Sequence, residues 1–136
     1  MKKLALFLVL GFVCIGHATE ILKESGESKV MYKGLKKVLG AVCADTRCLV
    51  MAGPVSCITI KNGNDYASTC KVTRKHHADQ IYTILGSQAR SMFHSLAEFK
   101  KPTCQTRSCI TMASSVECTS YGVIISDYRC RAEVED

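Results

Sequence analysis

The sequence predicts an α+β fold, a small disulfide-rich domain built from two tandem copies of a helix followed by a three-stranded antiparallel sheet. Three observations lead to this prediction. An even number of cysteines remains after a secretory leader, the cysteine spacing occurs twice, and each copy has an apolar helical period ahead of β-prone runs. Disulfides suit such a chain, because small modules bury too little apolar surface to be stable alone.

Residues 1–18 have the pattern of a signal peptide. Two lysines precede an apolar run from Leu4 to Ile15, and residues 16–18 place small side chains where a cleavage site is expected. The apolar run is too short to span a bilayer. Cys14 lies within it and is interpreted as a small apolar residue. We therefore predict a secreted, extracellular protein whose mature chain begins near residue 19.

Eight cysteines remain in the mature chain, in two sets with nearly the same spacing. An even count in a short secreted chain indicates four disulfides. Duplication favours bridges within each set, and three connectivities are open in each. We prefer Cys48–Cys57 with Cys43–Cys70, because Cys48 and Cys57 flank a predicted strand–turn–strand. The sets are Cys43, Cys48, Cys57 and Cys70, and Cys104, Cys109, Cys118 and Cys130.

The repeat extends upstream of the cysteines at an offset of 61 residues. Met31 aligns with Met92, and Leu35 aligns with Leu96. The last cysteine gap is one residue shorter in the second copy, which is interpreted as a loop deletion. We therefore predict a first unit at residues 19–75 and a second unit at residues 76–136. No long linker separates them, and they are expected to pack as one compact body.

The segment ahead of each cysteine set is predicted to be helical, because its apolar residues recur three or four positions apart. In the second copy Asp79 is the expected N-cap and Pro102 the expected end. Both apolar stripes are interpreted as core. They are Met31, Leu35, Val38 and Val42, and Ile81, Leu85, Ala89, Met92, Leu96 and Phe99.

The cysteine segments are β-prone. In the first copy we expect strands at residues 48–51, 55–61 and 66–73, with a turn at residues 52–54 and a hairpin tip at residues 62–65. The second copy has Ser114-Ser115 where the first has Gly53-Pro54. Each helix is expected to cover the three-stranded meander of its own copy. The tail from Asp127 to Asp136 is expected to fray.

The sequence contains no evident catalytic, cofactor-binding or metal-binding constellation. The cysteine gaps do not form paired zinc knuckles, and the basic residues are scattered rather than gathered in a nucleic-acid-binding stripe. His76 and His77 are compatible with a metal or general-base role, but such pairs are more often exposed loop residues. His94 falls off the apolar stripe and is interpreted as facing solvent.

The sequence favours a secreted, non-enzymatic binding protein that acts through contacts with an extracellular protein or receptor, without a cofactor or nucleic acid. One alternative is a cationic host-defence or toxin-like effector of membranes or channels, and membrane contact is not favoured. Another is a secreted enzyme or enzyme inhibitor. The predicted contact residues are Asn62, Gly63, Asn64 and Asp65, His76 and His77, and the loop at residues 120–123.

Overall fold

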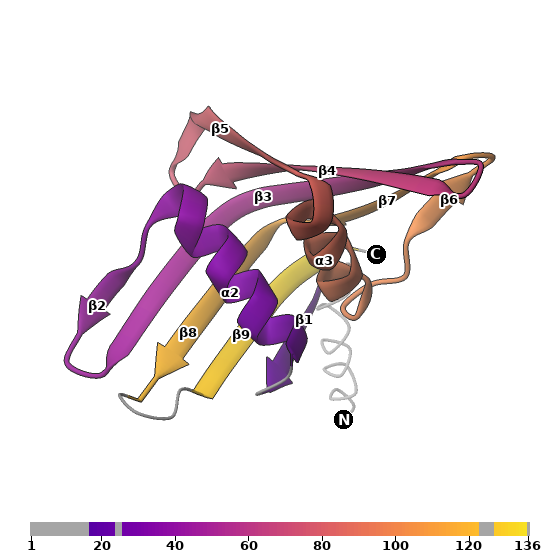
Figure 1. Ribbon diagram of the computed structural model, residues 1–136. Coiled ribbons are helices and arrows are strands. Elements are labelled where there is room, and N and C mark those ends of the chain that lie inside the picture. Colours follow the sequence, from indigo (N-terminus) through magenta and orange to yellow (C-terminus); the bar gives the residue numbers. More distant parts are fainter. Residues whose placement is uncertain (1–16, 24–25, 123–126, 136) are drawn as a thin grey trace, which may run out of the picture.

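The computed structural model describes residues 17–23, 26–122 and 127–135 (Figure 1). Most of the predicted signal peptide, including Cys14, lies outside these residues. The elements of the described residues are β1 His17–Lys23, α2 Gly26–Leu39, β2 Val42–Ala44, β3 Arg47–Asn62, β4 Asp65–Arg74, β5 His77–Leu85, α3 Gly86–Ala97, β6 Thr103–Gln105, β7 Ser108–Ala113, β8 Ser115–Tyr121 and β9 Asp127–Glu135. Neither of these two helices is long and apolar enough to cross a membrane.

All nine described strands belong to one antiparallel sheet. The order across it is β1-β9-β8-β3-β4-β5. Strands β8 and β7 follow one another along the same edge of β3, β8 opposite residues 47–52 and β7 opposite residues 55–60. The short strands β2 and β6 pair with β3 and β7. The predicted fold of two helix-plus-three-strand copies is therefore wrong. Its central strands are hydrogen-bonded to each other, from Arg47 opposite Tyr121 to Ile60 opposite Ser108, so they cannot form two separate sheets.

The turn expected at residues 52–54 is instead a bend within one 16-residue strand, β3. Ala52 and Val55 both face the core although they are three positions apart, so the alternation of side chains shifts at this point. The register with β4 shifts there too, as in a β-bulge. A Cβ at Gly53 would lie 3.4 Å from the Thr73 carbonyl oxygen, so glycine allows the neighbouring backbone to come close. The Gly-Pro pair therefore bends a strand rather than ending it.

Both helices lie on the same face of the sheet, and each packs over strands of the other predicted unit (Figure 1). Helix α2 lies over the bridge between β8 and β9, where Cys130 Sγ is 3.4 Å from the carbonyl oxygen of Ser28. Helix α3 lies over the bridge between β3 and β4, where Cys70 Sγ is 3.4 Å from the carbonyl oxygen of Ala89. The expectation that each helix covers its own meander is therefore wrong.

The second helix begins at Gly86, later than its apolar period predicts. Ile81 and Leu85 lie in β5 and are 58% and 65% exposed. Asp79 also lies in β5 and is not an N-cap, since α3 follows Leu85 without a side-chain cap. Residues of β5 pair with β4 from Leu85 opposite Thr69 to Ile81 opposite Thr73. This strand pairing outweighs the local helical pattern.

The four disulfides each join residues that lie directly opposite each other on paired strands, with Cα atoms 4.0 Å apart. Four bridges within the two sets are thus confirmed, but the preferred pairing is wrong. Cys48 and Cys57 both lie in β3, so one strand holds them too far apart to bond. The bridges are Cys43–Cys48, Cys57–Cys70, Cys104–Cys109 and Cys118–Cys130.

The core lies between the two helices and the sheet. Met31, Leu35 and Leu96 are fully buried there. A Cβ at Gly34 would lie 3.0 Å from Met92 Cε, so the helices approach closely at this glycine. The packing of the core therefore involves both helices and the sheet together, so these elements form one packing unit.

The C-terminal residues complete the sheet instead of fraying. Strand β9 lies between β1 and β8, and Cys130, Ala132 and Val134 are buried beneath the helices. The expectation of a frayed tail is therefore wrong, because long-range pairing orders this end of the chain.

Candidate functional site

Among the described residues, both helices cover one face of the sheet, and we call the other face the open face (Figure 1). Side chains on the open face form a row across four strands that is apolar except at Thr69. Ile110 lies opposite Ile58, Ile58 lies opposite Thr69, and Thr69 lies opposite Leu85. Ile58 and Ile110 are half-buried and Leu85 is exposed, and apolar groups gathered on a surface in this way are typical of interaction surfaces.

Met112 lies on the open face in β7 and is 60% exposed. It lies beside two shallow hollows of about 200 and 260 Å³, both of which Lys100 also lines. Lys101 lines the first hollow, and Pro54 lines the second. We call Ile58, Ile110, Met112, Lys100 and Lys101 the Met112 surface. It combines an apolar centre with a positively charged edge.

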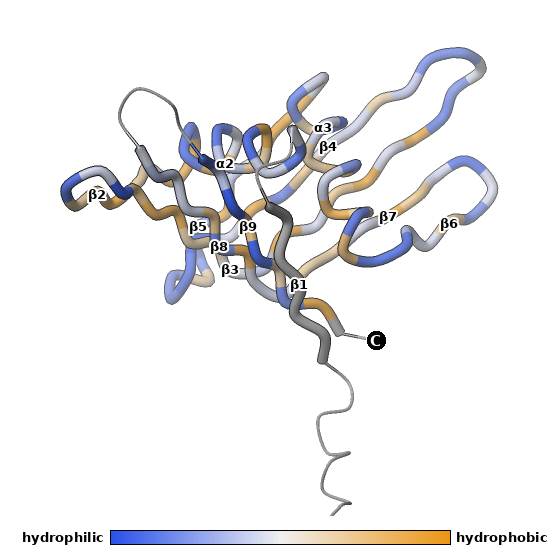
Figure 2. Tube along the Cα trace, turned by 90° about the horizontal axis from the view of Figure 1, so that it is seen from below, coloured by the Kyte–Doolittle hydropathy of each residue, from blue (hydrophilic) through white to orange (hydrophobic). Residues whose placement is uncertain are grey.

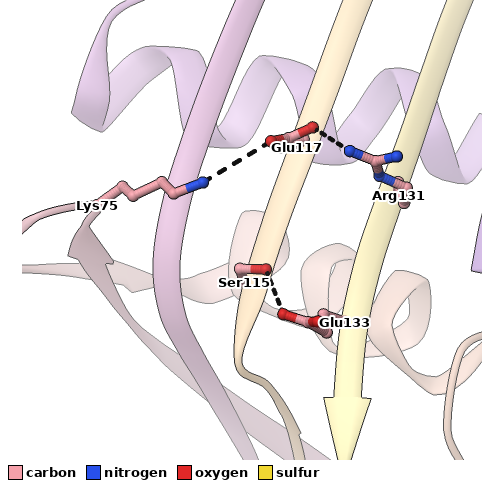
Figure 3. Close-up of polar contacts among 5 residues, drawn as sticks. All are labelled: Lys75, Ser115, Glu117, Arg131 and Glu133. Atoms are coloured by element: carbon pink, nitrogen blue, oxygen red, sulfur yellow. Dashed lines mark hydrogen bonds and ion pairs between the residues drawn. The ribbon is translucent and has the colours of Figure 1, made fainter. Parts of the chain in front are cut away.

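The part of the open face formed by β8 and β9 is charged instead (Figure 3). Glu117 pairs with Arg131 at 2.7 Å and with Lys75 at 3.8 Å between oxygen and nitrogen atoms. Ser115 Oγ donates to Glu133 Oε1 at 3.5 Å. These groups are partly exposed, so the pairs add little stability. They give this part of the face a fixed pattern of charge, which favours partner specificity.

The predicted contact tip at residues 62–65 lies at the end of the β3–β4 hairpin. All four of its residues are exposed, and Gly63 has a φ of +65°, which favours glycine in the turn. The tip lies beside the β6–β7 turn, because Lys61 N–H donates to the Arg107 carbonyl oxygen at 2.8 Å. Both tips are hydrophilic and project at one end of the sheet (Figure 2). The tip is available for contact but carries no cavity of its own among those described.

At the opposite end of β4, His76 lies in the β4–β5 turn and His77 begins β5. The strand places about 30 Å between them and the hairpin tip, so these predicted contact residues do not form one site. The histidines line a hollow of about 280 Å³ with Arg74 and Leu39. Arg74 Nη2 donates to the Leu39 carbonyl oxygen at 3.0 Å, which caps the end of α2.

The remaining predicted contact loop is only partly described. Ser120 and Tyr121 lie at the end of β8, Gly122 N–H donates to the Thr46 carbonyl oxygen at 3.0 Å, and residue 123 lies outside the described residues. Within the described part of the chain, no group of three or more His, Cys, Asp or Glu side chains is placed to hold a metal ion.

A cavity of about 400 Å³ lies between α3 and the β3–β4 hairpin, on the helix-covered side. Sequence reasoning missed this α3 cavity, because its lining comes from four separate segments. His94 is exposed, as interpreted from the helical period, but it lies at the edge of this cavity. The lining residues are Thr59, Tyr66, Arg90, Phe93, His94 and Cys109.

The corresponding place beside α2 is filled by Tyr128. Its ring centroid is 5.4 Å from that of Tyr32, and Lys29 Nζ lies 6.0 Å from the Tyr128 ring centroid. Burial, and secondarily the nearby Tyr128, raises the pKa of the Tyr32 hydroxyl, while a hydrogen bond with Ser120 opposes the shift. The folded protein therefore holds Tyr32 in its neutral form above the usual tyrosine pKa.

This shift predicts a loss of stability in alkaline solution. The unfolded chain deprotonates Tyr32 near pH 10, whereas the folded chain still binds the proton, so the free energy of unfolding falls as pH rises above about 10. Denaturant unfolding at pH 8 and pH 11 measures the fall. Tyr32→Phe is expected to reduce it, and the exposed control Tyr66→Phe is expected to leave it unchanged. An equal fall in wild type and Tyr32→Phe would contradict this assignment.

Comparison with protein-family models, with curated proteins and with solved structures finds no match to this chain. Four disulfides are consistent with an extracellular protein. Function is therefore inferred from the open face and the α3 cavity.

Proposed function

We propose that this protein is secreted and acts as a non-enzymatic binding protein, through protein–protein contacts made by the Met112 surface. The observation that carries the proposal is the 60% exposure of Met112 beside two hollows, on a sheet face that neither helix of the described residues covers. Methionine is flexible and polarizable, and it adapts to the shape of a partner. Four disulfides support a rigid surface that loses little entropy on binding.

The charges around the Met112 surface indicate the chemistry of the partner. Lys100 and Lys101 line the hollow beside Met112. Lys71 is exposed in the neighbouring row of side chains, opposite Ser56. An extracellular protein that presents apolar side chains flanked by carboxylates would complement this arrangement. We therefore assign the partner to this class.

An internal duplication belongs to the same proposal. Two hairpin bridges, Cys43–Cys48 and Cys104–Cys109, occupy matching places beside β3 and β7. Met51 and Met112, which the repeat aligns, both lie exposed on the open face. The duplicated pattern thus supplies two apolar contact points to one partner.

The membrane-effector alternative is less well supported. The apolar residues of the basic first helix, such as Met31 and Leu35, are fully buried against the sheet. A membrane-bound amphipathic helix needs that face free. Protein binding on the open face requires no such rearrangement.

Met112→Glu is expected to weaken partner binding at least tenfold, because it places a carboxylate in the apolar centre of the contact. The measurement is quantitative affinity capture with oxidised protein from the extracellular fluid of the source organism, followed by binding titrations of the captured protein. Val30→Glu is the matched control, since Val30 is 38% exposed on α2, away from the open face.

Support for the proposal requires a captured protein that binds wild type and Val30→Glu but does not bind Met112→Glu. Captured proteins that all three forms retain equally would show that binding does not use the Met112 surface. Leakage of lipid vesicles at low micromolar protein would favour the membrane alternative instead.

A further inference from the structure

We propose that the α3 cavity binds a small molecule made of one aromatic ring and a carboxylate. This site lies on the helix-covered side, and so it is separate from the Met112 surface on the open face. Its volume of about 400 Å³ is within the range of small-ligand sites. The chemistry of the ligand follows from a comparison of the two halves of the molecule.

Four of the six residues that line the α3 cavity align with residues of the same kind in the half that contains Tyr128. At the offset of 61, Phe93 aligns with Tyr32, Arg90 with Lys29, and Thr59 with Ser120. Cys109 aligns with Cys48 in the same way. Both places therefore have an aromatic ring and a cation on the helix, with a hydroxyl and a disulfide on the strands.

The two places differ in the residue that fills them. Tyr128 is the register partner of Ser120, and Ser68 is the register partner of Thr59. Counted back from the last cysteine of each set, Tyr128 and Ser68 are the same position. Ser68 Oγ lies 2.8 Å from Thr59 Oγ1, so its short side chain is held on the sheet. The α3 cavity is thus the space that a tyrosine ring occupies in the other half.

The phenol ring of Tyr128 indicates the kind of group that the α3 cavity can hold, because Tyr128 fills the corresponding space in the other half. It packs at a tilt against Tyr32, with a cation over the ring. A free aromatic ring in the α3 cavity would meet Phe93 in the same way. Tyr66 supplies a second aromatic wall. The ring of the ligand is therefore assigned to the apolar part of the cavity.

The guanidinium of Arg90 at the cavity edge defines the polar group of the ligand. Arg90 and His94 are four residues apart in α3, so they lie on the same side of the helix. Within the described part of the chain, Arg90 has no carboxylate partner. A guanidinium binds a carboxylate with two parallel hydrogen bonds. An acidic group attached to the ring would therefore complete the site.

The test uses 3-(4-hydroxyphenyl)propionate and its neutral amide as probes, titrated into the oxidised full chain and followed by amide NMR shifts and calorimetry. We expect saturable binding of the carboxylate with a dissociation constant on the order of 1 mM or tighter. The shifts should centre on Arg90, Phe93 and Tyr66. The amide should bind at least fivefold more weakly.

Three variants separate this site from nonspecific binding. Ser68→Tyr copies the residue found in the other half and should abolish binding by filling the cavity. Arg90→Gln should weaken the carboxylate at least fivefold and leave the affinity for the amide unchanged. Lys29→Gln is the matched control at the aligned position, where Tyr128 already fills the space, and should bind like wild type.

No saturable shift at Arg90, Phe93 or Tyr66 would overturn the proposal, as would equal affinities for the carboxylate and the amide. A folded Ser68→Tyr protein that binds like wild type would also overturn it. If Ser68→Tyr does not fold, Arg90→Gln decides the result, because Arg90 is exposed on the helix surface and its replacement leaves the core intact.

Discussion

The double substitution Cys57→Ala and Cys70→Ala is expected to lower the free energy of unfolding by about 4 kcal/mol. Loop closure across a sequence separation of 13 accounts for about 3 kcal/mol of this loss. The remainder, about 1 kcal/mol, comes from lost packing, since both residues are fully buried beneath α3. Guanidinium unfolding of the oxidised protein measures the effect.

The matched control removes the bridge between Cys43 and Cys48. Its sequence separation is 5 and its hairpin is largely exposed, so the expected loss is about 2 kcal/mol or less. Equal losses for the two bridges, or a greater loss at Cys43–Cys48, would show that burial beneath α3 does not set the contribution of the Cys57–Cys70 bridge.

Leu35→Ala is expected to lower the free energy of unfolding by about 3 kcal/mol, because it leaves a cavity in a fully buried site between α2 and the sheet. Leu96→Ala on α3 should have a similar effect. Because both helices cover one continuous sheet, each variant should still unfold in a single transition. Far-UV circular dichroism and tyrosine fluorescence should give coincident curves.

Val30→Ala is the control for this prediction, since Val30 is partly exposed on α2 and its truncation should cost about 0.5 kcal/mol or less. Two separate transitions in Leu35→Ala would mean that the halves of the sheet unfold independently, which would contradict the continuous pairing of β3 with β7 and β8.

Local signals in the sequence predicted the positions of two turns, but not the Met112 surface or the α3 cavity. The hairpin tip at residues 62–65 follows from its turn residues, and of the two exposed histidines, His76 lies in the β4–β5 turn and His77 begins β5. The Met112 surface could not be predicted in this way, because it depends on which strands are neighbours and which face the helices cover. The α3 cavity had one available signal, the contrast between Tyr128 and Ser68 in the aligned copies.

Two misread segments show why the predicted fold was wrong. Residues 52–54 have turn chemistry but bend a single strand, because β4 pairs with β3 on both sides of them and, at the other edge of β3, β7 takes over from β8. Ile81 and Leu85 continue a helical period but lie in β5, because β4 offers a pairing edge. In both cases long-range hydrogen bonds outweigh a local pattern.

The sequence by itself determined the features that depend on covalent chemistry and neighbouring residues. These are the even cysteine set that forms four bridges, the repeat in spacing, the first helix and the tight β3–β4 turn. Only the tertiary structure decided how these features combine. It joins the described strands into one sheet, places each described helix over the bridge of the other half and leaves the opposite face of these residues without a helix. These outcomes need the tertiary structure, because strand register and packing depend on contacts between residues far apart in the chain.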